Sequence, residues 1–489
     1  MSNDIHENNP LFKLKPFAHQ LKELNASWND RYYAVFWEMG TGKSKFIIDT
    51  AVQLYTHQEI DGLLIVAPKG MYMGWINDQI PEHMPEQVDY FKAYHSSSTN
   101  RVLKRRLAMA CSPSDGTLDI LCVNVEALST GKKAKALVES FLETHTTMMV
   151  IDESQTIKSP KANRTKYLLK IAHKAKYRRI LSGTPITQSP LDLFSQFEWL
   201  ERGITGHKSY YSFRSYFAEI VQMRLGTRTF PKITGYRNMD EIQKMIARNG
   251  SRYLKTECVD LPEKLYSTRY VELTPEQKEA YEKIRDEAVL MFDNGEMITV
   301  TNVLTAIQKL QQITCGHIKT EDGATIDIKS NRVNVLMETV SEVSGKAIIW
   351  CGYQRDVELV MAALNAEYED GVAVDYYGKT KDADREEHIH RFKNDPSCRF
   401  LVGTAACGGK GLNLTVANTV IYYSNTYNLE HRLQSEDRAH RIGQKNSVYY
   451  IDLACMDTVD TKIIDALRKK KNLADSLLDD WRDLLTPLA

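Results

Sequence analysis

The sequence lacks any hydrophobic run long enough to cross a bilayer. Its longest apolar runs, such as 63–67 and 148–151, fall far short of the ~20 residues that a membrane-spanning helix needs. The polar first ten residues also lack the apolar region of a secretory signal. We therefore expect a soluble intracellular protein without a membrane partner. A prokaryotic or viral origin, with a cytoplasmic location, is favoured over a eukaryotic, nuclear one.

Paired cysteines and an excess of one charge are also missing. The eight cysteines are scattered, without a Cys-x-x-Cys pair or a Cys/His cluster at zinc spacing, which predicts reduced, mostly buried thiols and no structural metal. The 63 basic and 63 acidic residues cancel, which excludes a histone-like or acidic-tail protein. A zero sum leaves local asymmetry of charge as the feature to look for.

Two series of short apolar runs indicate two α/β lobes. A chain of 489 residues suffices for two or three domains of ~150 residues. Near-continuous apolar runs between helix-length segments are typical of strands covered on both faces of a parallel sheet. The first series is 32–36, 62–67, 119–125, 148–151 and 178–181, and the second is 346–351, 372–376, 398–402, 419–423 and 448–453.

The stretch between the two series, 191–312, has helical periodicity, and we expect it to belong to neither sheet. Within it, Thr274 followed by Pro275 and Gln277 is typical of a capped helix start. The expected division is lobe 1 at 1–195, a helical insertion and linker at 196–265, the helical start of the second half at 266–330, and lobe 2 with a C-terminal helix at 331–489.

A glycine-containing loop between a strand and a helix predicts a nucleotide-phosphate site. The loop consists of Glu38, Met39, Gly40, Thr41, Gly42, Lys43 and Ser44. Such a turn wraps backbone N–H groups around phosphates, while Lys43 would neutralise the β and γ phosphates and the Ser44 hydroxyl would ligate Mg²⁺. Trp37 occupies the first glycine position of the general GxxxxGK[ST] pattern. An ordinary glycine-containing turn is therefore the alternative.

Two adjacent carboxylates, Asp152 and Glu153, follow the apolar run 148–151. Open α/β sheets bind ligands at the carboxyl ends of their strands. Phosphoryl transfer requires charge neutralisation and an oriented nucleophile, so Asp152 would hold Mg²⁺ and Glu153 would orient or deprotonate the attacking water. The alternative is a solvated acidic strand end, which the upstream phosphate loop makes less favoured.

Arg438 and Arg441 lie three residues apart, which would place both on one helical face within reach of one anion. An arginine brought to the γ-phosphate from another domain accelerates hydrolysis by ~10³ to 10⁵. A solvated basic helix face is the alternative.

Together and in this order, these segments resemble the ATPase core of helicase superfamily two, and within it the Swi/Snf-type DNA translocases. Two further segments look like the family's third and fifth motifs, 181–185 (Leu-Ser-Gly-Thr-Pro) and 408–414 (Gly-Gly-Lys-Gly-Leu-Asn-Leu). Subfamily character comes from 261–264, 310–315, 377–380 with Arg385, and above all 438–444 (Arg-Ala-His-Arg-Ile-Gly-Gln). The resemblance implies two tandem RecA-like lobes with helical insertions between them.

The resemblance also implies roles for individual residues. Arg441 would be the arginine finger, and Arg438 would join it at the phosphates or in lobe coupling. Gln20 resembles the glutamine that recognises adenine, although Pro16-Phe17-Ala18-His19-Gln20 stretches the usual spacing. Gln155 stands where many relatives have histidine. Residues expected to couple nucleotide state to nucleic acid are Ser182, Thr184, Gly409, Gly411 and Asn413.

The neutral chain has a strongly basic middle. From Ser154 to Leu191 there are nine basic residues and no acidic one, and from Ser154 to Arg237 sixteen basic residues stand against four acidic ones. Phosphate contacts supply most sequence-independent affinity for nucleic acid, so this stretch, including Lys174 and Lys176, predicts a track for the DNA backbone. A basic surface that only serves solubility is the alternative.

These observations lead to one main hypothesis, a monomeric ATP- and Mg²⁺-dependent motor on double-stranded or branched DNA. It would displace proteins, anneal strands or remodel forks, in repair or recombination. The rival enzyme is a strand-separating DNA or RNA helicase, which would need a wedge within 191–312. The non-enzymatic rival is a nucleotide-gated DNA clamp, which would need neither the carboxylate pair nor the finger.

Overall fold

The computed structural model divides the chain into two compact units, residues 1–260 and 261–489. It describes residues 5–69, 71–96, 100–112, 116–187, 189–225, 228–258, 261–293, 300–320, 322–408 and 412–469. None of the helices in this described part combines the length and apolar composition that spanning a bilayer requires. All eight cysteines are free thiols and five are buried, as expected.

Unit 1 is built on a seven-stranded sheet in the order β3-β4-β2-β5-β6-β1-β9, with all neighbours parallel. The strands are β1 (Tyr32–Val35), β2 (Gly62–Ala67), β3 (Tyr90–Tyr94), β4 (Leu118–Asn124), β5 (Thr147–Asp152), β6 (Tyr177–Leu181) and β9 (Gly250–Ser251). The helices, with 3₁₀- and π-helical turns written η, are α1 (Ala18–Ser27), α2 (Lys43–Thr56), α3 (Tyr72–Gly74), η1 (Trp75–Gln79), α4 (Ile80–His83), α5 (Arg101–Ala110), α6 (Ala127–Thr130), α7 (Lys132–Thr144), η2 (Ser154–Ile157), α8 (Asn163–Ile171), η3 (Ala172–Lys174), η4 (Pro190–Asp192), α9 (Leu193–Leu200), α10 (Tyr210–Phe217), α11 (Met239–Asn249) and α12 (Lys255–Cys258).

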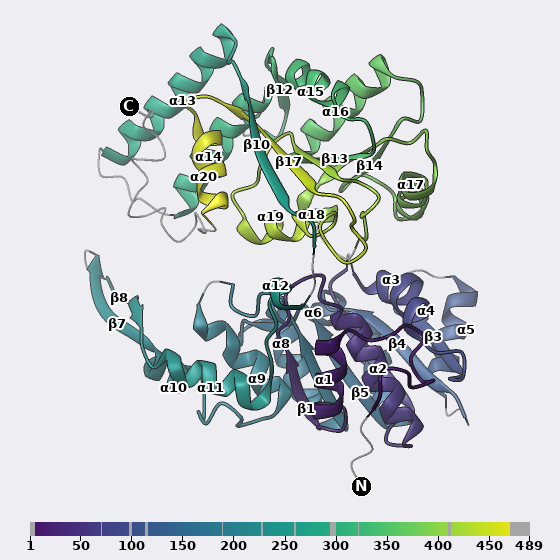
Figure 1. Cartoon of the computed structure of the whole chain (residues 1–489). Coiled ribbons are helices and arrows are strands. Elements are labelled where there is room, and N and C mark those ends of the chain that lie inside the picture. The colour runs from purple at the N-terminus through teal and green to yellow at the C-terminus, as the bar shows by residue number, and fades with distance from the viewer. Residues whose placement is uncertain are drawn as a thin grey trace. The chain divides into compact units, whose positions relative to one another are not determined.

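Helices cover both faces of this sheet (Figure 1). Alternate residues of β2 enter different cores: Leu63 and Ile65 pack on the α2 side, whereas Leu64 and Val66 pack on the side of α7, α8 and α9. Because side chains alternate across a strand, burial on both faces requires a continuous apolar run. The expected lobe 1 strands are therefore confirmed.

Unit 2 has a second parallel sheet in the order β10-β17-β16-β13-β15-β14. Its strands are β10 (Lys264–Val271), β13 (Ala347–Cys351), β14 (Ala373–Tyr376), β15 (Phe400–Thr404), β16 (Thr419–Tyr422) and β17 (Val448–Cys455), beside a separate hairpin of β11 (His317–Lys319) and β12 (Thr325–Asp327). The helices are α13 (Pro275–Asp293), α14 (Val300–Cys315), α15 (Arg332–Ser341), α16 (Gln354–Glu367), α17 (Asp382–Asn394), α18 (Ala405–Gly408), α19 (Leu429–Glu436) and α20 (Val459–Arg468). Two parallel sheets flanked by helices confirm the expected fold class.

The strands that the sequence pattern did not indicate all lie at sheet edges. β3 and β9 end the first sheet, and β10 ends the second. An edge strand is partly exposed, so it needs no continuous apolar run; β3 has one buried residue, Ala93, among half-buried neighbours. Edge position therefore explains why these strands were missed.

The stretch 191–312 differs from the expectation that it is helical and outside both sheets. It does contain helices, and Thr274 begins α13 as predicted, with reciprocal bonds of 3.1 and 3.2 Å to Gln277. However, β9 joins the first sheet and β10 the second. β7 (Ala218–Leu225) and β8 (Arg228–Tyr236) also form an antiparallel hairpin of their own.

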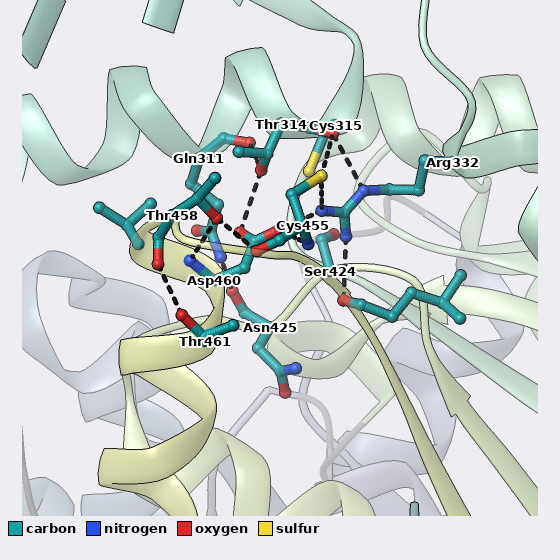
Figure 2. A network of polar contacts seen from close by, with 12 residues as sticks. Gln311, Thr314, Cys315, Arg332, Ser424, Asn425, Cys455, Thr458, Asp460 and Thr461 are labelled. Atoms are coloured by element: carbon teal, nitrogen blue, oxygen red, sulfur yellow. Dashed lines mark hydrogen bonds and ion pairs between the residues drawn. The ribbon is translucent and has the colours of Figure 1, made fainter. Parts of the chain in front are cut away.

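A buried ion pair fastens the C-terminal helix α20 to the rest of unit 2. Figure 2 shows Arg332 of α15 paired with Asp460 of α20, and Thr314 donating to the same carboxylate at 3.0 Å. The Arg332 guanidinium also donates to the carbonyls of Tyr423 (2.6 Å) and Leu453 (3.1 Å). Thr314 belongs to the segment 310–315, so this segment holds α14, α15, β17 and α20 together.

Candidate active site

The predicted phosphate loop lies at the carboxyl edge of the first sheet, between β1 and α2. Gly40 and Gly42 have left-handed backbones, with φ of 78° and 86°. At Gly42 this φ would strain any residue with a side chain. A Cβ there would also lie 2.2 Å from Nε2 of Gln20, so the Gln20 side chain would have to move. The Thr41 hydroxyl donates to the carbonyl of Glu38 at 2.8 Å and closes the turn. The loop thus adopts a glycine-dependent turn at a helix N-terminus, the geometry that suits an anion.

Lys43 folds back over this loop. Its ammonium donates to the carbonyls of Trp37 (2.8 Å) and Glu38 (3.1 Å), and its charge also acts on Asp152. The Lys43 charge thus acts on both the loop and Asp152, and its role at the β and γ phosphates stays a prediction.

Asp152 ends β5, beside the loop at the same edge of the sheet. Its carboxylate accepts hydrogen bonds from the Trp75 indole N–H (2.9 Å) and from the backbone N–H of Glu153 (3.0 Å). Burial raises the pKa of Asp152 to about 6; the Glu153 charge adds to the rise, while the Trp75 hydrogen bond and the Lys43 charge oppose it. A buried carboxylate with a raised pKa at a strand end is suited to accept a cation.

Glu153 leaves the strand in a left-handed conformation, with φ of 51°. This conformation costs a residue with a side chain ~1–2 kcal/mol. The Glu153 carboxylate is 5% exposed and accepts a hydrogen bond from Nε2 of Gln155 at 2.7 Å. Backbone strain is thus located at the residue predicted to orient water.

A relay of hydrogen bonds runs from Glu153 to the segment 181–185. The Ser182 hydroxyl donates to Oε1 of Gln155 at 2.7 Å, and the backbone N–H of Thr184 donates to the Ser182 hydroxyl at 3.0 Å. Gln155 therefore bridges Glu153 and Ser182 with the two ends of its amide. The relay thus connects two predicted motifs, since Glu153 follows the run 148–151 whereas Ser182 and Thr184 belong to 181–185.

Gln20 lies against the phosphate loop with both ends of its amide engaged. It accepts from the backbone N–H of Phe17 (2.8 Å) and donates to the carbonyl of Gly42 (2.9 Å). The neighbouring His19 ring contacts the Thr41 carbonyl at 2.9 Å, and burial lowers the pKa of His19. Helix α1 thus fixes the loop through hydrogen bonds to the carbonyls of Thr41 and Gly42. Adenine recognition by Gln20 stays a prediction.

In unit 2, Arg438 and Arg441 lie in the turns that follow α19, not on a helical face as expected. The helix ends at the buried Glu436, and the next bonds, Arg438 N to Ser435 O and Ala439 N to Glu436 O (both 3.3 Å), tighten the chain. Both guanidinium groups nevertheless converge, because each donates to the carbonyl of Leu412, at 3.3 and 3.4 Å.

A buried polar chain connects the segment 310–315 to Glu436, the last residue of α19. Gln311 donates to the carbonyl of Asn425 (2.6 Å), whose side chain accepts from Arg432 (2.6 Å). Arg432 also pairs with Glu436 at 2.8 Å. Burial alone would raise the pKa of Glu436, but Lys264 and Arg432 outweigh it and hold this pKa below its usual range. The segments 261–264 and 310–315 thus contribute Lys264 and Gln311 to one charged network at the end of α19.

Lys174 and Lys176 lie just before β6, at the edge of the sheet opposite to Lys43. Lys174 pairs with Glu143 at 2.6 Å and Lys176 with Glu59 at 2.7 Å. Arg178 and Arg179 of the same basic stretch are buried. Nucleic-acid contacts by Lys174 and Lys176 therefore stay a prediction.

Of the segment 408–414, the structure describes residues 408 and 412–414. Asn413 accepts from the hydroxyl of Thr415 at 3.1 Å and so caps a local turn. Gly409 and Gly411 lie outside the described residues.

Sequence reasoning missed Trp75, His19 and Arg432. Trp75 opens a five-residue π-helical turn, a rare geometry that is frequent at functional sites. Its bond to Asp152 spans 77 positions of the chain, so no local pattern indicates it. For His19, only its position next to Gln20 pointed to the loop.

Two known protein families match successive parts of this chain. Residues 35–318 match the SNF2-related domain family, and residues 331–443 match the helicase conserved C-terminal domain. The DNA annealing helicase and endonuclease ZRANB3 of Bos taurus is 26% identical over 92% of this chain. An uncharacterized ATP-dependent helicase of Mycoplasma pneumoniae is 26% identical over 90% of it. The chain covers 39% and 40% of these two relatives, about two-fifths of their length.

Among solved structures, the Sulfolobus solfataricus SWI2/SNF2 ATPase core in complex with dsDNA is similar, with 24% identity and a TM-score of 0.42. That similarity covers 98% of this chain and 97% of the other. The SNF2-related match alone spans more than half of the 489 residues. The chain therefore belongs to the SNF2-related family.

Proposed function

We propose that this protein is an ATP-dependent motor that translocates on double-stranded DNA and remodels branched DNA or protein–DNA structures. One observation carries the proposal: Lys43, Asp152 and Glu153 meet beside a glycine-dependent phosphate loop, and a hydrogen-bond relay leads from Glu153 toward Thr184. A hydrolytic site linked to a second motif is what a motor needs, because hydrolysis must be coupled to grip on the track.

The donor set fits Mg²⁺ held largely by a nucleotide. Ser44 supplies a hydroxyl at the start of α2 and Asp152 a buried carboxylate, and oxygen ligands are those that Mg²⁺ prefers. Among the described residues no group of three or more His, Cys, Asp and Glu side chains could hold a metal. Phosphate oxygens and water would complete the shell, as in other sites where Mg²⁺ binds with a nucleotide. Bound there, the cation would neutralise charge on the phosphates.

The protein groups divide the remaining work. Lys43 would release its loop carbonyls and turn to the β and γ phosphates. Glu153, held by Gln155, would orient or deprotonate the attacking water. Arg441, with Arg438 beside it on the Leu412 carbonyl, would reach the γ-phosphate when the two lobes close. A clamp that never hydrolyses ATP would need neither this arginine finger nor the carboxylate pair Asp152 and Glu153.

The nucleic-acid partner is proposed from the relatives and from charge. ZRANB3 is named an annealing helicase, and the similar Sulfolobus core is in complex with dsDNA. The basic middle of this chain gives such a partner sequence-independent affinity. We place the protein on duplex or branched DNA, as a monomer.

A triplex-displacement assay tests this function. ATP hydrolysis should displace a third strand placed ahead of the motor, while a blunt duplex of equal length stays paired. Translocation needs only alternating grip on the backbone, whereas unwinding must also break stacking of ~1.4 kcal/mol per base-pair step. Robust unwinding of the blunt duplex, or stronger ATPase stimulation by RNA than by duplex DNA, would contradict it.

The second candidate, a strand-separating helicase, is favoured by one observation. The β7–β8 hairpin lies within 191–312, the region where a wedge would be required. The same blunt-duplex arm of the assay decides between the two.

A further inference from the structure

The β7–β8 hairpin extends beyond α10 and α11, away from the sheet of unit 1 (Figure 1). Its base is packed against the core of unit 1: Ala218 is buried, and Ile220 and Ile233 touch the core. Arg237 pins that base by donating to the carbonyls of Ser215 (2.7 Å) and Tyr216 (3.0 Å). An isolated two-stranded hairpin is marginally stable in water, so this anchor is what holds it in place.

The exposed surface around the hairpin combines positive charge with aromatic rings. Among the residues of 208–237 whose side chains the structure describes, four are basic (Lys208, Arg214, Lys232 and Arg237) and one is acidic (Glu219). Within this segment Tyr211 is 58% exposed and Tyr236 39% exposed, and the Arg214 guanidinium lies 5.4 Å from the centre of the Tyr211 ring. On the hairpin itself, the exposed Val221 and Lys232 face each other across the strands.

This combination is selective for one kind of partner. Four cations against one anion complement a polyanion, whereas the centre of a protein–protein interface is depleted of charge. Exposed aromatic rings stack on bases, but only on bases that are not already stacked inside a duplex. Charge and rings together therefore suit nucleic acid that contains unpaired bases next to a duplex.

We propose that the β7–β8 hairpin, with Tyr236 at its base and Tyr211 on the helix α10 that leads into it, binds the branch point of forked DNA. Phosphates of the arms lie along Lys232, and unpaired bases stack on the two tyrosines. This inference rests on the proposed function and goes beyond it, since it names the DNA structure that the motor selects.

The test measures equilibrium affinity for forked DNA and for blunt duplex DNA of equal length. The double variant Tyr211→Ala/Tyr236→Ala should lower fork affinity at least ~5-fold, since stacking on one aromatic ring contributes this much or more. Blunt-duplex affinity should change far less. The matched variant Tyr211→Phe/Tyr236→Phe keeps the rings and should retain the preference for forks. Tyr270→Ala removes an equally exposed tyrosine from unit 2 and should have no effect.

Crosslinking provides a second measurement that does not depend on variants with weakened binding. A photocrosslinker on Val221→Cys should label nucleotides at the branch point, with the unsubstituted chain as background. Labels spread evenly along the arms, or equal loss of fork and duplex affinity in the alanine variant, would overturn the proposal. Equal labelling of an RNA fork would overturn the choice of DNA. If the unsubstituted protein shows no DNA-stimulated hydrolysis, the proposed function fails instead.

Discussion

The indole of Trp75 donates a hydrogen bond of 2.9 Å to the carboxylate of Asp152, from a π-helical turn to a strand end. This bond opposes the effect of burial, which raises the pKa of Asp152 to about 6. The ionised carboxylate is therefore less stable in the folded protein than in the unfolded chain, where its pKa is ~3.9.

Asp152→Asn should accordingly stabilise the nucleotide-free protein at pH 7.5, by up to about 3 kcal/mol. The gain should shrink as the pH falls through 6, because the folded protein then protonates Asp152 and no longer carries the buried charge. Urea unfolding at pH 7.5 and pH 5 measures this. A gain that is independent of pH would show that burial of the charge is not its cause.

Lys43→Ala and Glu153→Gln should fail at different steps of hydrolysis. Lys43→Ala removes the cation at the phosphates and should abolish both nucleotide binding and turnover. Glu153→Gln keeps a side chain of the same shape and should retain Mg²⁺-ATP binding while turnover falls. Binding of a fluorescent nucleotide beside single-turnover hydrolysis separates the two. Wild-type turnover by Glu153→Gln with DNA present would refute the role of this carboxylate.

Ser182→Ala should weaken the coupling between hydrolysis and DNA. The change removes the donor to Gln155 and leaves that buried amide oxygen without its bond, a loss of ~1–1.5 kcal/mol that corresponds to roughly tenfold. The ratio of kcat with and without duplex DNA should fall by about this factor. Ser154→Ala is the matched control, since this equally buried hydroxyl bonds to Gln196 at 2.6 Å instead. The same drop in both variants would mean a general packing effect.

Arg441→Ala and Arg438→Ala should separate catalysis from stability. Arg438 is 6% exposed and donates to the carbonyls of Gln434 and Leu412, so its loss should destabilise the fold by ~1–3 kcal/mol. Arg441 is half-buried, and its loss should reduce kcat by ~10³ while nucleotide affinity and thermal stability largely persist. Reduced affinity with unchanged kcat for Arg441→Ala would instead indicate ground-state binding.

Two pairs of lysines should differ in their effect on the salt dependence of DNA binding. Lys174 and Lys176 already pair with Glu143 and Glu59, whereas Lys166 and Lys170 are exposed on α8. Each lysine that contacts a phosphate contributes ~1 to the slope of log affinity against log salt. Lys166→Ala/Lys170→Ala should therefore flatten the slope by up to ~2, and Lys174→Ala/Lys176→Ala by less. A larger effect of the second pair would restore the prediction made from the sequence.

The sequence by itself determined the central strands of both sheets and the start of α13. A central strand is buried on both faces and must be apolar throughout, and a helix start needs local capping such as that of Thr274. Both requirements act on residues that are neighbours in the sequence, so the sequence alone predicts them. The phosphate loop and the pair Asp152 and Glu153 could be predicted for the same reason, since each follows such a strand.

Only the tertiary structure decided the edge strands β3, β9 and β10, the β7–β8 hairpin and the partners of charged side chains. An edge strand needs apolar residues only where its neighbours happen to cover it, and β10 pairs with β17, far along the chain. The pairing of Trp75 with Asp152, of Lys174 with Glu143 and of both arginines with Leu412 likewise joins distant segments. These contacts depend on which distant segments the fold brings together, and local sequence periodicity does not predict which segments those are.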